Sequence, residues 1–237
     1  MEFSICIDIS RCTACRACQV ACKSWNRLKA EQTENRGSHE NPPDLSATTW
    51  NRIVFMEARM PGEKIEWSFF NDRCRHCEDA PCMDAADSVP GAIIRDNTGA
   101  VIFTEKTSQL DYDSIVSECP YDIPRLDEET NRIYKCTMCI DRITNGLKPA
   151  CVATCSTGAL NFGTKKDMLK LAYERIKLLG KDANLYPGEE YNTFWILPEK
   201  QERYPIAKAA DNRPYRIARN TFLKQLTKKL IGREIPV

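Results

Sequence analysis

The sequence predicts an α+β fold in which short strands and short helices surround groups of closely spaced cysteines. Three observations support this prediction. Cysteines recur at short, fixed spacings in three parts of the chain, the strand-like and helix-like segments between them are short, and one longer amphipathic pattern follows the last group. A chain of 237 residues has room for one large domain or two small ones.

The first half of the chain predicts a strand, a helix and a hairpin. Residues 3–9 alternate apolar and polar side chains, the pattern of a half-buried strand. Helical spacing follows the first cysteines as far as Trp25. The polar stretch 27–44 contains a glycine and a Pro-Pro pair, and it predicts an extended linker. Residues 51–60 and 66–70 predict two strands paired around a Pro-Gly turn.

The second half predicts another hairpin, two helices and a last strand. Residues 92–95 and 100–103 flank a short turn that ends in glycine, which is typical of a hairpin. Residues 112–119 predict a short helix that stops before a proline. Residues 164–179 carry apolar side chains at helical spacing and are followed by glycine, so they predict an amphipathic helix. Residues 192–197 predict one more strand.

Twelve of the thirteen cysteines form patterns that suit cubane iron–sulfur clusters. The patterns are C-x2-C-x2-C-x3-C, then C-x2-C-x4-C with a separate Cys-Pro further on, then C-x2-C-x11-C-x3-C. A [4Fe–4S] cluster takes one thiolate at each of four irons, and a C-x2-C loop can present two thiolates to neighbouring corners. Such repeated groups therefore predict clusters of this type.

The ligands are assigned by a rule known from two-cluster ferredoxins, in which the fourth cysteine of each run ligates the other cluster. The rule predicts that Cys155 completes the first run and that Cys22 completes the third. Three [4Fe–4S] clusters follow. Their predicted ligands are Cys12, Cys15, Cys18 and Cys155 for cluster 1, Cys74, Cys77, Cys82 and Cys119 for cluster 2, and Cys22, Cys136, Cys139 and Cys151 for cluster 3. Residues 1–26 and 120–165 then form one module with two clusters.

Residues 45–119 predict an inserted module that has kept one cluster and lost another. Cys119 precedes a proline, as the last cysteine of a ferredoxin run does. The lost site would need ligands at four positions that hold other residues, namely Ala86, Gln109, Tyr112 and Ile115. Because every ligand of that site is missing together, the pattern supports the exchange of fourth cysteines between runs.

Zinc and disulfides are the alternatives for these cysteines. A structural zinc site competes about equally for Cys136 and Cys139 taken alone, but the whole chain supplies only two histidines, His39 and His76. Disulfide scaffolds are usually shorter and lack repeated C-x2-C loops. We interpret His76 as an ordinary loop histidine, with a hydrogen bond to a cluster sulfur as the alternative. Cys6 is expected to be an unligated thiol on the other face of its strand.

Composition excludes several classes of function. The formal charge of +1 gives no strong field for nucleic acid. The sequence has no run of about 18 apolar residues, so no membrane span is predicted. The first residues do not resemble a signal peptide. No acid–base or nucleophile constellation is found outside the cysteines, so no catalytic residues are predicted.

Four segments resemble the iron–sulfur subunit of molybdenum- and tungsten-dependent oxidoreductases of the DMSO-reductase family. They are RCTACRACQVACK, CRHCEDAPC, ECPYDIPR and KCTMCIDRITNGLKPACVATC, and the resemblance runs from about Ile5 to Phe162. The lost middle cluster and the stretch ENRGSHENPPDL resemble the small (beta) subunit of two-subunit formate dehydrogenases. Cys155 departs from the family pattern, because Ser156 follows it where these runs usually have proline.

The resemblance implies two ferredoxin-like modules and a non-catalytic role in electron transfer. Such a subunit relays electrons between a large molybdenum- or tungsten-pterin catalytic subunit, which oxidises formate or reduces CO2, and a cytochrome or another carrier. It implies periplasmic location by co-export with the catalytic subunit, with a cytoplasmic complex as the alternative. A free-standing polyferredoxin, an iron–sulfur subunit of another enzyme of the family and a zinc-stabilised interaction module are the competing hypotheses.

Residues 166–237 are expected to form a C-terminal helix and a basic tail that docks on the partner. From Gln201 onward the chain carries nine Lys or Arg against three Asp or Glu. The tail could instead be solvated, or could lie on a membrane surface.

Seven cations flank the cysteine runs and could raise cluster potentials, although backbone N–H groups are expected to matter more. These cations are Arg11, Arg16, Lys23, Arg73, Arg75, Lys135 and Arg142.

Overall fold

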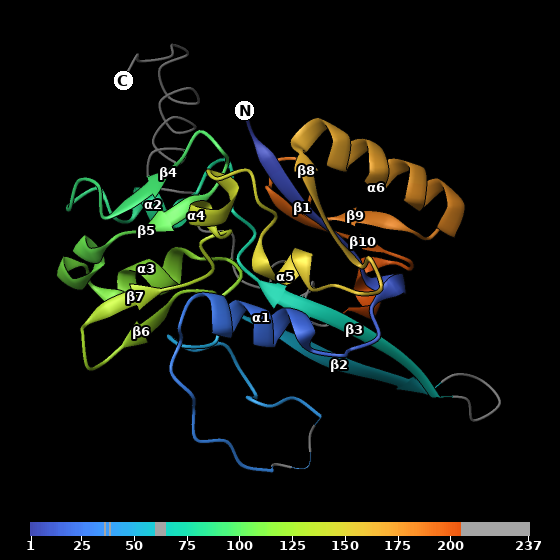
Figure 1. Cartoon of the computed structure of the whole chain (residues 1–237), viewed down its shortest axis with the longest axis horizontal. Helices are drawn as coiled ribbons and strands as arrows, with labels where there is room; N and C mark the ends of the chain where they lie inside the picture. Colours follow the sequence, from blue (N-terminus) through green and yellow to red (C-terminus); the bar gives the residue numbers. More distant parts are fainter. Residues whose placement is uncertain (36, 38, 60–64, 205–237) are drawn as a thin grey trace, which may run out of the picture.

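The structure is a computed structural model, and it describes residues 1–35, 37, 39–59 and 65–204. A four-stranded sheet and the longest helix lie at one end of the molecule, and short hairpins and short helices lie at the other (Figure 1). The mixture of helices and strands confirms the predicted α+β class. The predicted basic tail, which starts at Gln201, falls mainly on residues 205–237, which lie outside the described part.

The four-stranded sheet joins the two ends of the described chain. Its strand order is β8-β1-β10-β9. β1 (Phe3–Asp8) pairs antiparallel with β8 (Leu160–Thr164) and parallel with β10 (Thr193–Leu197). β10 pairs antiparallel with β9 (Asn184–Tyr186). β1 and β10 confirm the two strands expected over residues 3–9 and 192–197.

Both faces of β1 are buried, which corrects the prediction of a half-buried strand. Ile5 and Ile7 pack on one side with Trp195, while Cys6 packs on the other side with Phe194 under α6. Period-two alternation separates the two sets, as the pleat of a strand requires. Because α6 covers the second face, Cys6 is 0% exposed, and burial raises the pKa of its thiol to about 12.

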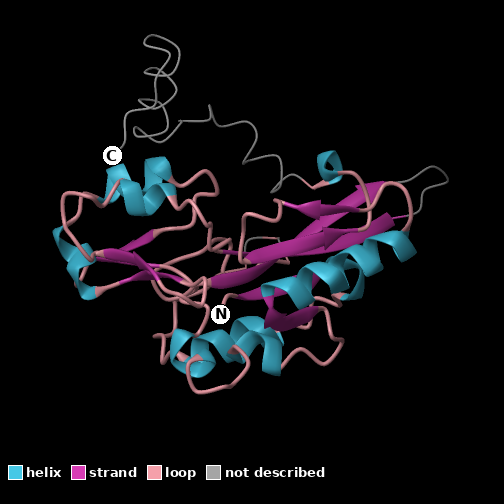
Figure 2. Ribbon diagram, turned by 90° about the horizontal axis from the view of Figure 1, so that it is seen from above, coloured by secondary structure: helices cyan, strands magenta, loops and turns pink. Residues whose placement is uncertain are grey.

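The helix α6 (Lys165–Leu179) confirms the amphipathic pattern and has defined ends. Thr164 caps its N-terminus by accepting a hydrogen bond from the backbone N–H of Asp167 at 3.2 Å. The helix stops at Gly180, whose φ of +112° is accessible to glycine. Met168 and Ala172 face the sheet, and Figure 2 shows the helix lying along it. No helix in the described ranges is long and apolar enough to cross a membrane.

A long hairpin connects the sheet to the cysteine loops. It consists of β2 (Asn51–Arg59) and β3 (Ile65–Arg73), which confirm the predicted pair, whereas the predicted Pro61-Gly62 turn lies outside the described residues. Phe70 of β3 stacks on Trp195 of the sheet at a centroid distance of 5.1 Å. β3 ends directly before Cys74, so the stacked pair fixes the start of the middle cysteine loop.

The other end of the molecule contains short elements. The hairpin of β4 (Ile93–Arg95) and β5 (Val101–Phe103) and the helix α3 (Tyr112–Glu118) confirm predictions, while the hairpin of β6 (Arg125–Asp127) and β7 (Arg132–Tyr134) was not predicted. The other short α-helices among the described residues are α1 (Ala17–Trp25), α2 (Pro81–Asp84), α4 (Ile140–Ile143) and α5 (Ala150–Ala153). The same part of the chain has 3-10 helices over Ile9–Arg11, Glu105–Gln109 and Gln201–Arg203.

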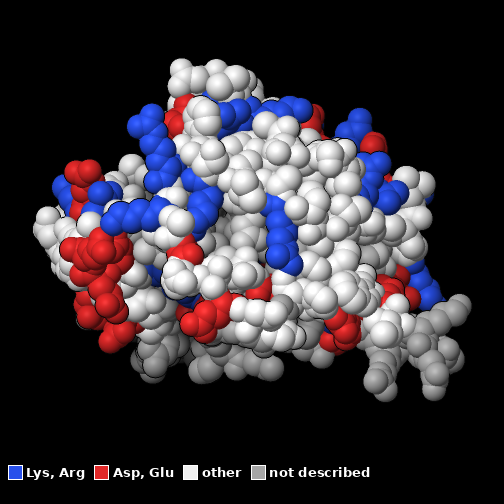
Figure 3. Space-filling view, turned by 60° about the horizontal axis from the view of Figure 1, so that its bottom comes forward, with Lys and Arg blue, Asp and Glu red and all other residues white. Residues whose placement is uncertain are grey.

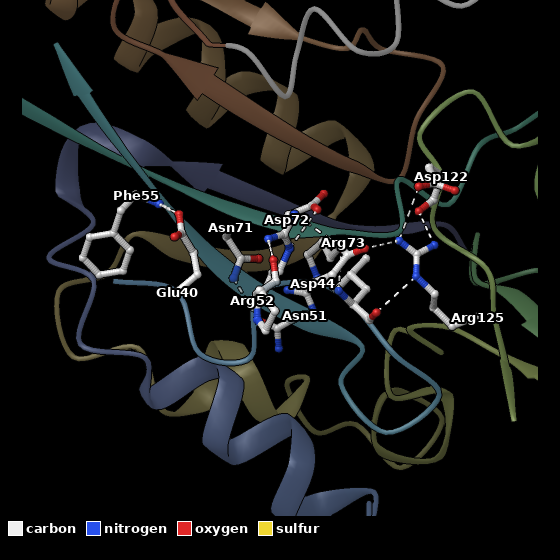
Figure 4. A network of polar contacts seen from close by, with 12 residues as sticks. Glu40, Asp44, Asn51, Arg52, Phe55, Asn71, Asp72, Arg73, Asp122 and Arg125 are labelled. Carbon is white, nitrogen blue, oxygen red and sulfur yellow. Dashed lines mark hydrogen bonds and ion pairs between the residues drawn. The ribbon is translucent and has the colours of Figure 1, made fainter. Parts of the chain in front are cut away.

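The division into a split first module, an inserted module and a C-terminal unit stays a prediction. Residues 166–204 of the predicted C-terminal unit contribute β9 and β10 to the sheet that contains β1, and α6 packs on one face of that sheet. The linker over 27–44 has no helix or strand among its described residues. It is tied to the hairpin where the backbone N–H of Phe55 donates to Glu40 at 2.8 Å and where Arg52 pairs with Asp44 at 3.5 Å (Figure 4).

We predict that Cys6→Ala leaves the iron content unchanged and lowers the melting temperature by about 2–4 °C, because it removes one buried atom from the contact with α6, which costs about 1 kcal/mol. Iron assay and a thermal melt of the purified protein measure the two effects. A loss of iron would identify Cys6 as a ligand.

Candidate iron–sulfur sites

The three C-x2-C loops share one backbone geometry. The residue before the second cysteine of each loop is left-handed, with φ of 54° at Ala14, 49° at His76 and 57° at Met138. The backbone N–H groups of His76 and Met138 donate to the first cysteine sulfur of their loops, both at 3.4 Å. The N–H of Ala14 donates to Cys12 in the same way. Non-glycine residues adopt this conformation at a cost, which is common at functional sites. Each loop thus directs an N–H group at a sulfur.

The structure brings together the four cysteines predicted for cluster 1. Burial raises the pKa of the Cys12 thiol, and the nearby Cys155 and Cys15 raise it further. Burial raises the pKa of Cys18 to about 12, and Cys12 and Cys155 also contribute. Cys15 is exposed, whereas Cys18 is buried. This group therefore lies between the core and the surface.

Two asparagines of the long hairpin hold Cys18. The side-chain amide of Asn71 donates to the Cys18 sulfur at 3.5 Å and to Asn51 Oδ1 at 2.9 Å, while the Asn51 amide donates to the Cys18 carbonyl at 3.1 Å. Figure 4 shows the two side chains facing each other from β2 and β3. Neither residue was singled out from the sequence, because one asparagine in a strand pattern carries no signal of its own.

Cys155 is held by a turn that needs no proline. Leu160 donates its backbone N–H to the Cys155 sulfur at 3.4 Å, and Gly158 donates to the Cys155 carbonyl at 3.2 Å. Gly158 has a φ of +66°, which closes the turn before β8. The replacement of the usual proline by Ser156 is therefore accommodated by the glycine two residues later.

The four cysteines predicted for cluster 2 line one small cavity. Cys74, Cys77, Cys82 and Cys119 contribute to its wall, together with apolar side chains and Lys135. Burial raises the pKa of Cys77, and Cys74, Cys82 and Cys119 raise it further. The C-terminal segment fixes this loop, because the backbone of Asn192 donates to the His76 carbonyl at 3.0 Å and Thr193 donates to the Arg75 carbonyl at 2.9 Å.

The four cysteines predicted for cluster 3 also converge. Burial raises the pKa of Cys22, and Cys136, Cys151 and Cys139 add to it. Burial raises the pKa of Cys139 to about 12, with Cys136 as the next cause. All four are buried. Cys22 comes from α1 and Cys151 from α5, so two short helices supply the ligands that the third C-x2-C loop lacks.

Apolar packing surrounds the positions where the sequence predicts a lost cluster site. Ala86 and Ile115, at two of these four positions, are 4% and 0% exposed in one apolar group. Tyr112 packs against that group, and Gln109 is exposed. The residues at these positions therefore supply ordinary core and surface rather than metal ligands.

The donor set fits cubane iron–sulfur clusters. All thirteen cysteines lie in the described part of the chain, and none is disulfide-bonded. Among the described residues, no three His, Cys, Asp or Glu side chains converge tightly enough to hold a single metal ion. Neutral thiols lose their protons when they bind metal. In addition, the guanidinium of Arg73 is 1% exposed and points at Cys151 and Cys136, so this position suits a group with negative charge.

His76 has a structural role in its loop. Its Nδ1 accepts a hydrogen bond from the backbone N–H of Val101 at 3.0 Å, and the side chain is 0% exposed. Burial holds the pKa of His76 well below its usual value, so the imidazole is neutral. The hydrogen bond from this residue to a cysteine sulfur comes from its backbone N–H rather than from its ring.

Comparison with known proteins agrees with this geometry. Residues 65–165 match the family model of a 4Fe-4S dicluster domain. The protein is 46% identical over 206 residues to formate dehydrogenase 2 subunit beta (cytochrome c-553) of Nitratidesulfovibrio vulgaris, covering 84% of this sequence and 94% of that one. It is 47% identical over 210 residues to the formate dehydrogenase subunit beta of Megalodesulfovibrio gigas, covering 85% and 97%.

A more distant relative widens the family. The protein is 30% identical over 171 residues to the B subunit of anaerobic dimethyl sulfoxide reductase of Escherichia coli, covering 71% of this sequence and 77% of that one. The higher identity to the two formate dehydrogenase subunits extends over nearly their whole length. The protein belongs to the family of iron–sulfur (beta) subunits of formate dehydrogenases, to which the dimethyl sulfoxide reductase subunit is related.

Proposed function

We propose that this protein holds three [4Fe–4S] clusters and relays electrons between a molybdenum- or tungsten-pterin catalytic subunit and an external carrier such as a cytochrome. The observation that carries the proposal is the convergence of twelve cysteines into three groups, each of which joins segments far apart in the sequence. Each cluster, when bound, stores one electron at a potential that the surrounding protein sets.

The residues of this protein position and shield the clusters. N–H groups of the three C-x2-C loops donate to sulfur, which lowers the cost of added negative charge. The groups also lie next to one another: Cys18 of the first group lies near Cys151 of the third, and Arg73 precedes Cys74 of the second group while it contacts Cys151. The three clusters would therefore form a continuous path.

The first cluster is the proposed site of electron exchange with a partner subunit. Cys15 is the exposed member of its group and lies just before α1. α1 also exposes Val20, at 67%, and Trp25, at 44%. The face that carries α1 comes forward in Figure 3, where a broad area holds few charged side chains. A surface with few charged side chains beside the exposed Cys15 suits a stable subunit interface.

The relative from N. vulgaris carries cytochrome c-553 in its name, which supports a cytochrome as the carrier for this protein. Formate oxidation is the proposed source of electrons. Location in the periplasm, by co-export with the catalytic subunit, is part of the same proposal.

We predict that the complex purified through a tag on this protein contains a large subunit with molybdenum or tungsten, and that formate reduces clusters in this protein. Metal analysis and electron paramagnetic resonance (EPR) after formate addition measure both. Purification as a stable monomer that formate cannot reduce would instead support a free-standing polyferredoxin, and a colourless zinc protein would support an interaction module.

Iron analysis tests the number of clusters. The protein isolated from the complex should hold about twelve irons and twelve sulfides, because each cubane holds four of each. Four or eight irons would contradict the ligand assignment.

Replacement of one ligand tests the independence of the clusters. We predict that Cys119→Ala removes about four irons and the EPR signal of one cluster while the other two remain, because the Cys119 thiol lines the cavity of the second group. Cys6→Ala is the matched control, since it removes a buried thiol outside all three groups. Loss of all clusters in Cys119→Ala, with the control intact, would show that the groups do not form independently.

A further inference from the structure

Arg73 lies in the loop of one cysteine group and contacts another. It is the last residue of β3 and directly precedes Cys74 of the second group. Its Nη1 and Nη2 both donate to the Cys151 sulfur at 3.2 Å, and Nη2 also reaches the Cys136 sulfur at 3.6 Å. The side chain therefore crosses from the second loop to the third group.

Lys135 makes the reverse crossing. It directly precedes Cys136 of the third group, yet its side chain lines the cavity of the second group. Its Nζ donates to the Val101 carbonyl at 2.5 Å and to the Cys136 carbonyl at 3.1 Å. Cys77 and Cys82 of the second group line the same cavity as this ammonium group. The second and third loops thus exchange one cation each.

Both cations are buried without a carboxylate partner among the described residues. Arg73 is 1% exposed and Lys135 is 4% exposed. Arg75, two residues from Arg73 and equally buried, instead pairs with Asp72 at 2.9 Å. A buried charge without a counter-ion destabilises the folded protein. A cubane with four thiolates carries a net charge of about −2 when oxidised and about −3 when reduced, so it can neutralise such a cation.

We propose that Arg73 and Lys135 are reciprocal counter-ions. Arg73, from the second loop, raises the reduction potential of the third cluster, and Lys135, from the third loop, raises the reduction potential of the second cluster. The inference rests on the proposed function and deepens it. A fixed cation stabilises the reduced cluster more than the oxidised one, because reduction adds one negative charge, and burial keeps this interaction from being screened by water. The reaction is the addition of one electron, and it requires no proton.

The experiment is a redox titration of the purified complex followed by EPR, with Arg73→Met, Lys135→Met and the wild type. Cys119→Ala identifies the signal of the second cluster by its loss. We expect Arg73→Met to lower the reduced-to-oxidised ratio of the third cluster at a fixed potential about tenfold, which equals ~59 mV for a one-electron couple. We expect Lys135→Met to do the same to the second cluster, and we expect each variant to shift the other of these two clusters much less.

Two further variants separate charge from structure. Arg73→Lys keeps the cation, so we expect the third cluster of this variant to keep most of its wild-type potential. Arg132→Met is the matched control, because Arg132 of β7 lies shortly before Cys136 of the third group but pairs with the exposed Glu105 at 3.6 Å, where water screens its charge. We expect Arg132→Met to leave the potential of the third cluster nearly unchanged.

The possible results are distinct. Unchanged potentials in Arg73→Met and Lys135→Met with full iron content would overturn the inference, as would a shift of the same cluster by both variants. If a methionine variant loses iron, the glutamine variants Arg73→Gln and Lys135→Gln carry the same comparison, and unchanged potentials there overturn it equally. A wild type with fewer than about twelve irons would instead contradict the proposed function.

Discussion

The pairing of β1 with β8 is the interaction on which the cysteine arrangement depends. β1 leads into the 3-10 turn that precedes Cys12, and β8 begins five residues after Cys155. Their register, with Ile7 opposite Leu160, places these two cysteines side by side although more than a hundred residues separate them. The backbone N–H of Asp8, which donates to the Ala159 carbonyl at 2.8 Å, extends the pairing to the edge of the site. Without this pairing, the exchange of fourth cysteines between runs would have no scaffold.

The parallel pairing of β1 with β10 extends the same scaffold to the second group. The residues just before β10 and at its start bond to the backbone of the loop between Cys74 and Cys77, and Trp195 of β10 stacks on Phe70 of β3. One small sheet therefore connects the first and second cysteine groups. An electron carrier benefits from such rigidity, since transfer needs redox centres at fixed, short separations, and the buried cations have a defined effect only when the loops do not move.

Much of this arrangement could be predicted from the sequence, because local spacing encodes it. The cysteine runs, the two predicted hairpins, α3 and α6 depend on nearby residues. The hairpin of β6 and β7 was missed because its strands are short and carry charged residues, such as Arg125 and Arg132, and its turn depends on Asn131 with a φ of 53°. The burial of both faces of β1 could not be foreseen, since it depends on where α6 packs. In the sequence, Arg73 and Lys135 cannot be told apart from the five other cations that flank the cysteine runs. Only the tertiary structure shows which cysteine group each side chain reaches.

The central claim is that cysteines from remote segments complete each other's clusters. Anomalous diffraction at the iron absorption edge, from crystals of the iron-loaded complex, tests it most directly. Within this protein the account predicts three four-iron sites, with Cys155 bonded to the iron group of Cys12 and Cys22 bonded to the iron group of Cys136. A fourth cubane in this protein, or Cys22 and Cys155 each bonded within its own neighbouring run, would contradict it.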